Sequence, residues 1–265
     1  MKIIVCVKQI PDPETPAAVF RVDEGAKKVV PAQGIAPVIN PFDAQAVEAA
    51  LRLKDAAGEG SVTVLSFGAE SARDAIKHAL AMGADEGVLV TDANWDKLDN
   101  FAVAQVLAKA IESIGVPDVI VTGRQGADWD MGVVPSGLAE LLDLPVSTIL
   151  RSVEASNGSL VTQRVLGDGF DTVEVPLPAV VSISNEFGEP RYPQLRQIMM
   201  AAKKTVDIKS LADVGVDGDG TQLNRLVLER LYTPQVNTQV ELIEGDSPEE
   251  KAKNLAAKLR EAKII

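Results

Sequence analysis

Four short apolar runs rich in β-branched residues alternate with amphipathic segments over the first 143 residues, and this alternation restricts the fold more than any other feature of the chain. The runs lie at residues 2–9, 61–66, 88–91 and 119–122, and the amphipathic segments with helical spacing at 40–57, 71–82, 100–114 and 135–142. Strands that alternate with helices form parallel sheets with right-handed crossovers. The sequence therefore predicts an α/β fold built on a doubly wound parallel sheet.

The pattern changes after Ser147, where four further strands follow one another without helices, at 148–155, 159–166, 172–175 and 178–184. Asn157-Gly158 separates the first two of them, and Asn-Gly between strands is a strong hairpin signal. An antiparallel appendage on the parallel sheet accounts for this pattern. A smaller hairpin is predicted for residues 20–31.

Residues 205–265 form a sparse tail. Ser247-Pro248-Glu249-Glu250 predicts the start of a helix, with Ser247 and Glu250 as a capping box and Pro248 in the first turn. The apolar face of that helix is residues 252, 255, 256 and 259. Because such a tail has little core of its own, we expect a long C-terminal arm that wraps a partner chain.

Two other helix starts carry capping signals. Asn40-Pro41-Phe42-Asp43 places Asn at the cap and Pro in the first turn, and Ser71 and Asp74 resemble a capping pair. Both signals are explained by local structure alone.

The stretch from Val119 to Asp143 joins a buried-type strand to a helix through a loop that contains Gly126, Asp128, Asp130 and Gly132. The backbone N–H groups at such a helix start can hold a phosphate. The loop has neither the G-K-[ST] of a Walker motif nor a G-x-G-x-x-G. A nucleotide loop and an ordinary turn between strand and helix both remain open. Asp128 and Asp130 fit loop-ordering caps or partners of ribose hydroxyls.

Ligands of doubly wound sheets bind at the carboxyl ends of the strands. This rule selects residues 7–9, 66–68 and 123–135 as neighbours around one site.

Composition excludes several classes of chemistry. The net charge of −12 disfavours a nucleic-acid partner and suits docking onto basic proteins. With one Cys and one His, a disulfide within the chain cannot form and a zinc site is not expected. Cys6 is interpreted as a buried hydrophobe and His78 as a surface or boundary residue. We expect no metal and no catalytic side chain, so that any reactive chemistry belongs to a cofactor.

No apolar run is long enough to span a bilayer, and the N-terminal residues form a strand without the architecture of a signal peptide. A protein that is not embedded in a membrane, located in the cytoplasm, is the expectation from these features.

Residues 185–204 have a different composition from the segments predicted to form the sheet. Pro190 and Pro193 prevent a regular element at the start, and Arg191 and Tyr192 place a cation beside an aromatic ring. Leu195 and the apolar residues 198–200 then follow. A protein-docking surface and a simple cover for the sheet edge both account for this composition.

Residues 177–204, LPAVVSISNEFGEPRYPQLRQIMMAAKK, resemble the signature of the electron-transfer flavoprotein β-subunit family. VCVKQIPD near the start, NPFDAQAVEAALRLK, residues 81–85 and GRQGADWD in the central loop extend the resemblance over essentially the whole chain. What it implies is the non-catalytic half of a heterodimer whose α-subunit makes most of the FAD contacts.

The resemblance also implies an adenine nucleotide bound by residues 1–204. In the housekeeping group this nucleotide is a structural AMP, whereas in the bifurcating group a second FAD takes a hydride from NADH at the equivalent site. The family's nucleotide contacts correspond to Cys6, Asn40, Pro41, Phe42, Asp43, Phe67, Gly68, Gln125, Gly126, Asp128, Asp130, Met131, Gly132, Val133 and Val134. Residues 205–265 correspond to the arm and helix that pack on the α-subunit.

The family's recognition loop, which docks acyl-CoA dehydrogenases, corresponds to residues 189–200. Leu195 is its apolar anchor, and a quinone oxidoreductase is a further partner that the resemblance allows. The docking residues are Glu189, Pro190, Arg191, Tyr192, Leu195, Ile198 and Met199.

The chain departs from the family pattern in its nucleotide loop. Met131 and Val133 stand where many relatives have phosphate-binding polar side chains, so backbone N–H groups must do more of the binding. Trp129 replaces the Gly of bifurcating relatives and favours AMP, although the bifurcating alternative stays open. Met200 stands where some relatives carry a methylated Lys. A third alternative, an adenine-nucleotide hydrolase or ATP sensor, needs phosphate-cleaving residues that the sequence does not show.

Overall fold

A computed structural model describes residues 1–234 and 239–265 of the chain. The described chain divides into a large unit, Met1–Leu231, and a small one, Tyr232–Ile265. Each unit is described by itself below.

One nine-stranded sheet forms the centre of the large unit, in the order β11-β10-β9-β12-β8-β1-β6-β7-β13. All neighbours in it are parallel except β9 with β10 and β10 with β11. The mostly parallel sheet and its antiparallel hairpin confirm the predicted α/β class. The strands are β1 Lys2–Cys6, β6 Ser61–Phe67, β7 Glu86–Val90, β8 Val119–Gly123, β9 Val146–Ser156, β10 Ser159–Val165, β11 Phe170–Pro176, β12 Ala179–Ile183 and β13 Asp207–Lys209.

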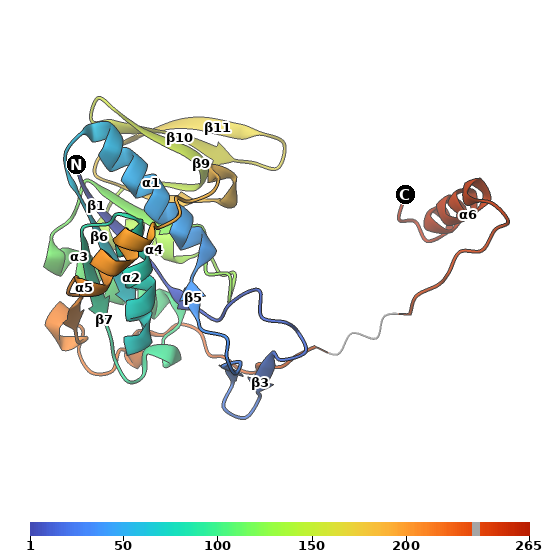
Figure 1. The fold of residues 1–265 in the computed structure, drawn as a ribbon, viewed down its shortest axis with the longest axis horizontal. Coiled ribbons are helices and arrows are strands. Elements are labelled where there is room, and N and C mark those ends of the chain that lie inside the picture. The colour runs from blue at the N-terminus through green and yellow to red at the C-terminus, as the bar shows by residue number, and fades with distance from the viewer. Residues whose placement is uncertain (235–238) are drawn as a thin grey trace. The chain divides into compact units, whose positions relative to one another are not determined.

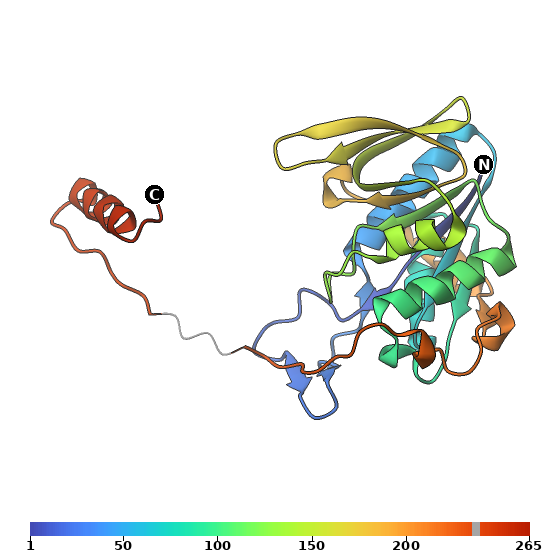
Figure 2. The ribbon, with the colours of Figure 1, turned by 180° about the vertical axis from the view of Figure 1, so that it is seen from behind.

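Helices cover both faces of this sheet (Figures 1 and 2). On one face lie α1 (Pro41–Ala57), α2 (Arg73–Met82) and α5 (Leu195–Lys203), and on the other α3 (Asn100–Ile114) and α4 (Val134–Leu142). Successive residues of β1 point to opposite faces, so Ile3 and Val5 pack beneath α1 while Ile4 packs beneath α3. The two faces therefore carry two separate hydrophobic cores, as a doubly wound sheet requires.

The strand predicted for residues 2–9 leaves the main sheet earlier than expected. β1 ends at Cys6, and Gln9–Ile10 form a separate short strand, β2, that pairs antiparallel with β5 (Val38–Ile39). The change of direction occurs at Lys8, whose backbone groups bond to α1 rather than to a neighbouring strand. The predicted hairpin at 20–31 is confirmed as β3 (Arg21–Asp23) and β4 (Lys28–Val30).

The start of α1 predicted at Asn40 is confirmed, whereas the cap predicted at Ser71 is wrong. Asn40 does occupy the cap position of α1, but its side chain makes no capping hydrogen bond. Ser71 lies in a 3₁₀ turn, Glu70–Ala72, and its hydroxyl donates to Gln9 Oε1 at 2.7 Å while α2 begins at Arg73. In both places the side chain predicted to cap the helix forms a hydrogen bond with a residue far away in the sequence instead.

Residues beyond α5 still belong to the large unit. β13 extends the sheet beside β7, and Leu211, Val214 and Val216 are buried in the core under α3. The large unit therefore continues past the predicted division at 204/205, up to Leu231. The other 3₁₀ turns among the described residues are Trp95–Lys97, Asn185–Phe187, Ala212–Val214 and Thr221–Leu223.

The described residues of the small unit contain one helix, α6 (Pro248–Glu261), which starts where the capping box predicted. Ser247 Oγ accepts the N–H of Glu250 at 3.2 Å, and Lys258 forms an ion pair with Glu241. No side chain of α6 is buried. Residues 235–238, in the middle of the predicted arm, lie outside the described residues, and the packing of that arm on another chain stays a prediction. Within the described ranges, no helix has the length and apolarity needed to cross a membrane.

Candidate functional site

The strand order reverses at β1, which lies between β6 and β8. From β1 the chain continues into α1 on one face of the sheet, whereas from β8 it continues into α4 on the opposite face. The two connections diverge to opposite faces of the sheet, and open α/β sheets bind their ligands in the crevice at the carboxyl ends of the strands where this happens. The strand ends selected from the sequence meet here.

The first turn of α1 ties the two central strand ends together through Asp43. Its Oδ2 accepts the Lys8 N–H at 2.7 Å, and its Oδ1 accepts the Gly123 N–H at 3.1 Å. The carboxyl group is only 6% exposed. Burial raises the pKa of Asp43 to about 7, although the two backbone hydrogen bonds act in the opposite direction. A carboxyl group whose pKa is close to neutral pH therefore lies between β1 and β8.

Gly123 is required for this approach of α1 to β8. A Cβ at this position would lie 2.3 Å from Asp43 Oδ1 and 2.8 Å from the carbonyl carbon of Phe42. Only glycine leaves enough room for the helix start to reach the strand end.

Asn40 holds the loop that follows β8, which explains why its side chain does not cap α1. Its Nδ2 donates to the carbonyl of Gln125 at 2.8 Å, and its Oδ1 accepts the Ala127 N–H at 3.1 Å. Asn40 is 1% exposed. Both ends of the amide are thus used to fix the backbone of the loop.

The acidic side chains of the loop are paired, one with a lysine that follows β1 and the other with a glutamine of the loop itself. Lys8 Nζ binds both carboxylate oxygens of Asp128, at 2.7 and 2.8 Å, and Gln125 Nε2 donates to Asp130 Oδ1 at 2.6 Å. Asp130 and Gly132 both take left-handed backbone conformations. These bonds fit the loop-ordering role considered for the two aspartates.

With its side chains so arranged, the loop leaves main-chain donors free. The N–H groups of Met131, Gly132 and Val133 donate to no acceptor among residues 1–234 and 239–265, and α4 begins directly afterwards at Val134. Free N–H groups at a helix start attract anions.

Two buried hydroxyls near the strand ends also have no hydrogen-bond partner in the described part of the chain. They are Thr122 Oγ1 in β8, on the α3 and α4 face, and Ser66 Oγ in β6, on the α1 and α2 face. Buried polar atoms are normally paired, so these two fit a site that binds a polar ligand. The residues present are therefore suited to a nucleotide.

The other predicted contacts on β1, β6 and α1 lie around the same crevice. Burial, and then the charge of Asp43, raises the pKa of the Cys6 thiol to about 12, so Cys6 is not available as a thiolate. Phe67 and Gly68 are buried at the end of β6. Pro41 is exposed. The guanidinium carbon of Arg124 lies 5.6 Å from the centroid of the Phe42 ring.

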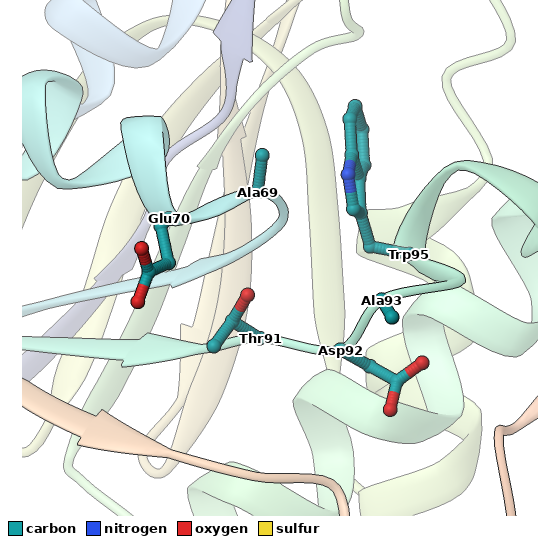
Figure 3. A pocket seen from close by; sticks show the side chains of 6 residues that line it. All are labelled: Ala69, Glu70, Thr91, Asp92, Ala93 and Trp95. Atoms are coloured by element: carbon teal, nitrogen blue, oxygen red, sulfur yellow. The ribbon is translucent and has the colours of Figure 1, made fainter.

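A pocket of about 370 Å³ lies beyond the ends of β6 and β7. Figure 3 shows the methyl group of Ala69 and the indole of Trp95 on opposite sides of it, with Thr91 below Ala69 in this view. Sequence reasoning missed this cavity, although the strand-end rule applied to residues 88–91 would have pointed to it. Its lining residues are Ala69, Glu70, Thr91, Asp92, Ala93 and Trp95.

The predicted docking residues lie away from the crevice, on the segment that follows β12. Residues 195–203 form α5, which the sequence analysis did not anticipate, although the apolar residues 195, 198 and 199 have helical spacing. Tyr192 is 84% exposed, Leu195 74% and Met199 60%, while Glu189 and Ile198 are also exposed and Pro190 is half-buried.

Arg191 differs from these neighbours because its guanidinium forms ion pairs with Glu48 and Asp55 of α1. Arg191 and Tyr192, which are adjacent in sequence, thus have different surroundings: Arg191 contacts α1, whereas Tyr192 is exposed to solvent.

Comparison with known proteins gives a consistent family. Residues 28–214 match the model of the electron transfer flavoprotein domain. The whole chain is 36% identical to an electron transfer flavoprotein subunit beta of Thermoanaerobacterium thermosaccharolyticum and 35% identical to one of Clostridium acetobutylicum, each covered over its full length. It is also 32% identical, over the full length of both chains, to the caffeyl-CoA reductase-Etf complex subunit CarD of Acetobacterium woodii.

Proposed function

This chain belongs to the electron transfer flavoprotein β-subunit family, and from that premise we propose that it forms a heterodimer with an α-subunit and carries electrons from dehydrogenases to a downstream acceptor. FAD, held mainly by the α-subunit, supplies a flavin ring that accepts and releases one or two electrons. The β-subunit contributes an adenine nucleotide site, a docking surface and an arm that packs on the α-subunit.

The crevice between the ends of β1 and β8 carries the nucleotide part of the proposal. Its free N–H groups at 131–133 and the unpartnered Thr122 hydroxyl are the donors that a phosphate and a sugar need. Because the side chains of Met131 and Val133 cannot donate hydrogen bonds, the main chain would hold the phosphate. We propose AMP as the nucleotide, with a structural role.

Exposed apolar side chains support the other two parts of the proposal, the docking surface and the arm that packs on the α-subunit. In the small unit, Val240 and Leu242 are more than 80% exposed and α6 buries no residue, so this segment needs a partner surface. The α-subunit is the proposed partner. Tyr192, Leu195 and Met199 form the surface proposed to dock acyl-CoA dehydrogenases, and a quinone oxidoreductase is the proposed acceptor.

A second candidate function is a bifurcating β-subunit with FAD in the crevice and hydride transfer from NADH. Full-length similarity to CarD, a subunit of a caffeyl-CoA reductase-Etf complex, favours it. Trp129 is 47% exposed and makes no part of the core. It is the residue to replace by glycine if the site is to be widened.

The deciding experiment purifies the tagged chain with its natural partners, denatures the complex and counts the released nucleotides. One FAD and one AMP per heterodimer is the expected result. Two FAD molecules, bleached by NADH, would establish the bifurcating function instead. A preparation without flavin and without an α-subunit would contradict both, and measurable ATP turnover would favour the hydrolase alternative.

A further inference from the structure

The segment between β12 and α5 is held on α1 by a cluster of charged side chains centred on Glu48. Glu48 is 4% exposed, and its carboxylate accepts hydrogen bonds from Arg52 Nε at 2.7 Å and from Arg191 Nε at 2.7 Å. The backbone N–H of Arg191 donates to the same carboxylate at 3.0 Å. Arg191 Nη2 also reaches Asp55, about two turns of α1 further on, at 3.0 Å.

The charges in this cluster depend on one another. Burial alone would raise the pKa of Glu48, but the hydrogen bonds from Arg191 and Arg52 outweigh it, and the pKa lies below its ordinary value. Glu48 is therefore ionised at neutral pH. Removing Arg191 would leave a buried carboxylate with one cation fewer, which is costly in a low-dielectric position.

Further contacts from α1 bind the same stretch of chain. The Arg52 guanidinium lies 4.8 Å from the ring centroid of Phe187, and Gln45 Nε2 donates to the carbonyls of Asn185 and Gly188 at 3.4 and 3.3 Å. Residues 185–191 are thus attached to α1 along their length.

The far end of the docking surface is attached separately. Lys77 Nζ of α2 donates to the carbonyls of Ala201 and Ala202 at 2.9 and 3.1 Å. Lys204 Nζ donates to the carbonyls of Ala84 and Asp85. The exposed side chains of Tyr192 and Leu195 lie between these two attachments.

We propose that Arg191 is a positioning residue whose ion pairs with Glu48 and Asp55 fix the path of residues 185–191 and so direct Tyr192 and Leu195 toward the dehydrogenase. Its guanidinium binds its own chain, and the docking contact is made by its neighbours. The inference rests on the proposed docking function, and it assigns to Glu48, a residue of a helix outside the docking segment, a part in forming the docking surface.

A double-mutant cycle in the co-expressed heterodimer tests the proposal. The readout is the apparent KM of the heterodimer as the electron acceptor of an acyl-CoA dehydrogenase. Arg191→Gln and Glu48→Gln are each expected to raise KM about tenfold, the factor that corresponds to about 1.4 kcal/mol, with kcat little changed. Because both act through the same ion pair, the double variant should be no worse than the more affected single variant. Multiplying effects would overturn the proposal and make Arg191 a direct contact.

Arg196 provides the matched control. It is an exposed arginine of α5 that forms no ion pair among the described residues. In the double variant Arg196→Gln/Glu48→Gln, the factor by which KM rises should be the product of the factors measured for the two single variants. If Glu48→Gln impairs folding, Asp55→Asn removes the more exposed partner and should raise KM about twofold.

Hydrogen exchange separates the positioning role from the docking function. In Arg191→Gln and Glu48→Gln, amides of residues 185–191 should exchange faster, whereas those of 125–134 should not change. Unchanged exchange at 185–191 would overturn the proposal whatever the kinetics. Faster exchange together with a Leu195→Ala variant that transfers electrons normally would instead reject the docking function and leave the positioning role standing.

Discussion

Two irregular segments leave the carboxyl ends of neighbouring parallel strands and then differ in what they expose. β8 and β12 are paired in register, Gly123 beside Ile183. The loop after β8 uses its polar side chains internally and leaves backbone N–H groups free. The segment after β12 uses its polar side chains at its base and leaves apolar side chains exposed.

The difference follows from the ligand that each segment is proposed to bind. A phosphate needs oriented donors, and small fixed dipoles in a crevice provide them. A protein partner needs apolar area, which long side chains on a short helix provide. Both segments are fixed to α1, the first through Asn40 and Asp43, the second through Gln45 and Glu48.

The largest effect is expected where the loop after β8 meets α1. Gly123→Ala would place a methyl group against Asp43 and the backbone of Phe42, so we expect a loss of about 3 kcal/mol in unfolding free energy and loss of the nucleotide. Chemical denaturation of the heterodimer measures the first and nucleotide analysis the second. Gly167→Ala is the control, because a Cβ there meets nothing within 4 Å. Equal stability of the two variants would contradict the close approach.

Asn40→Ala should loosen the loop without displacing β8. Two hydrogen bonds are lost and half-buried backbone groups of Gln125 and Ala127 are left unpaired, so the expected cost is about 2 kcal/mol. Hydrogen exchange should increase at 125–127 and stay unchanged at 185–191. Asn40→Asp keeps the acceptor for Ala127 but not the donor to Gln125, and its exchange should lie between that of Asn40→Ala and the wild type.

Asp43 predicts a pH dependence confined to the first segment. Its folded pKa, about 7, is above the unfolded value of 3.8, so its stabilising contribution is full below about pH 4 and is lost as the pH rises through 7. The difference in unfolding free energy between wild type and Asp43→Asn should therefore shrink across this range. One pKa unit corresponds to about 1.4 kcal/mol. A difference independent of pH would show that Asp43 titrates at its ordinary value.

The smallest effect on stability is expected in the docking segment. Leu195→Ala removes a side chain that is 74% exposed, so unfolding should change by less than about 0.5 kcal/mol and flavin content should stay the same. Electron transfer from an acyl-CoA dehydrogenase should nevertheless show a KM raised about tenfold, because the leucine is buried only on docking. Loss of flavin instead would show that the docking surface is elsewhere.

The sequence predicted the elements whose signals are local. α3 has the bounds 100–114 that its apolar spacing predicted, and α6 starts at its capping box. α5 was missed because Pro190 and Pro193 concealed a helix that begins immediately after them. β13 was missed because a strand of three residues carries no periodicity.

The contacts that build the site could not be read from local pattern. Asp43 and Gly123 are 80 residues apart, and Glu48 and Arg191 are 143 apart. The local sequence predicted that Asn40 caps α1 and that Arg191 lies beside the ring of Tyr192. In the fold, Asn40 donates instead to the distant carbonyl of Gln125, and Arg191 donates to the distant carboxylate of Glu48. The strand-end rule brought residues 7–9, 66–68 and 123–135 together as neighbours because it depends on topology, which the alternation of strands and helices predicts, whereas ligand binding there stays a prediction.

The seating of both segments on α1 restricts how the chain can change in length. An α-helix turns by about 100° and rises by about 1.5 Å for each residue, so one residue inserted between Asp43 and Glu48 would rotate one set of anchors away from its partners. The interval between them, which also carries the buried core residues Ala46 and Val47, thus tolerates neither insertion nor deletion. Added residues are accommodated instead at the exposed turns around Gly158 and Gly167, where nothing packs against the backbone.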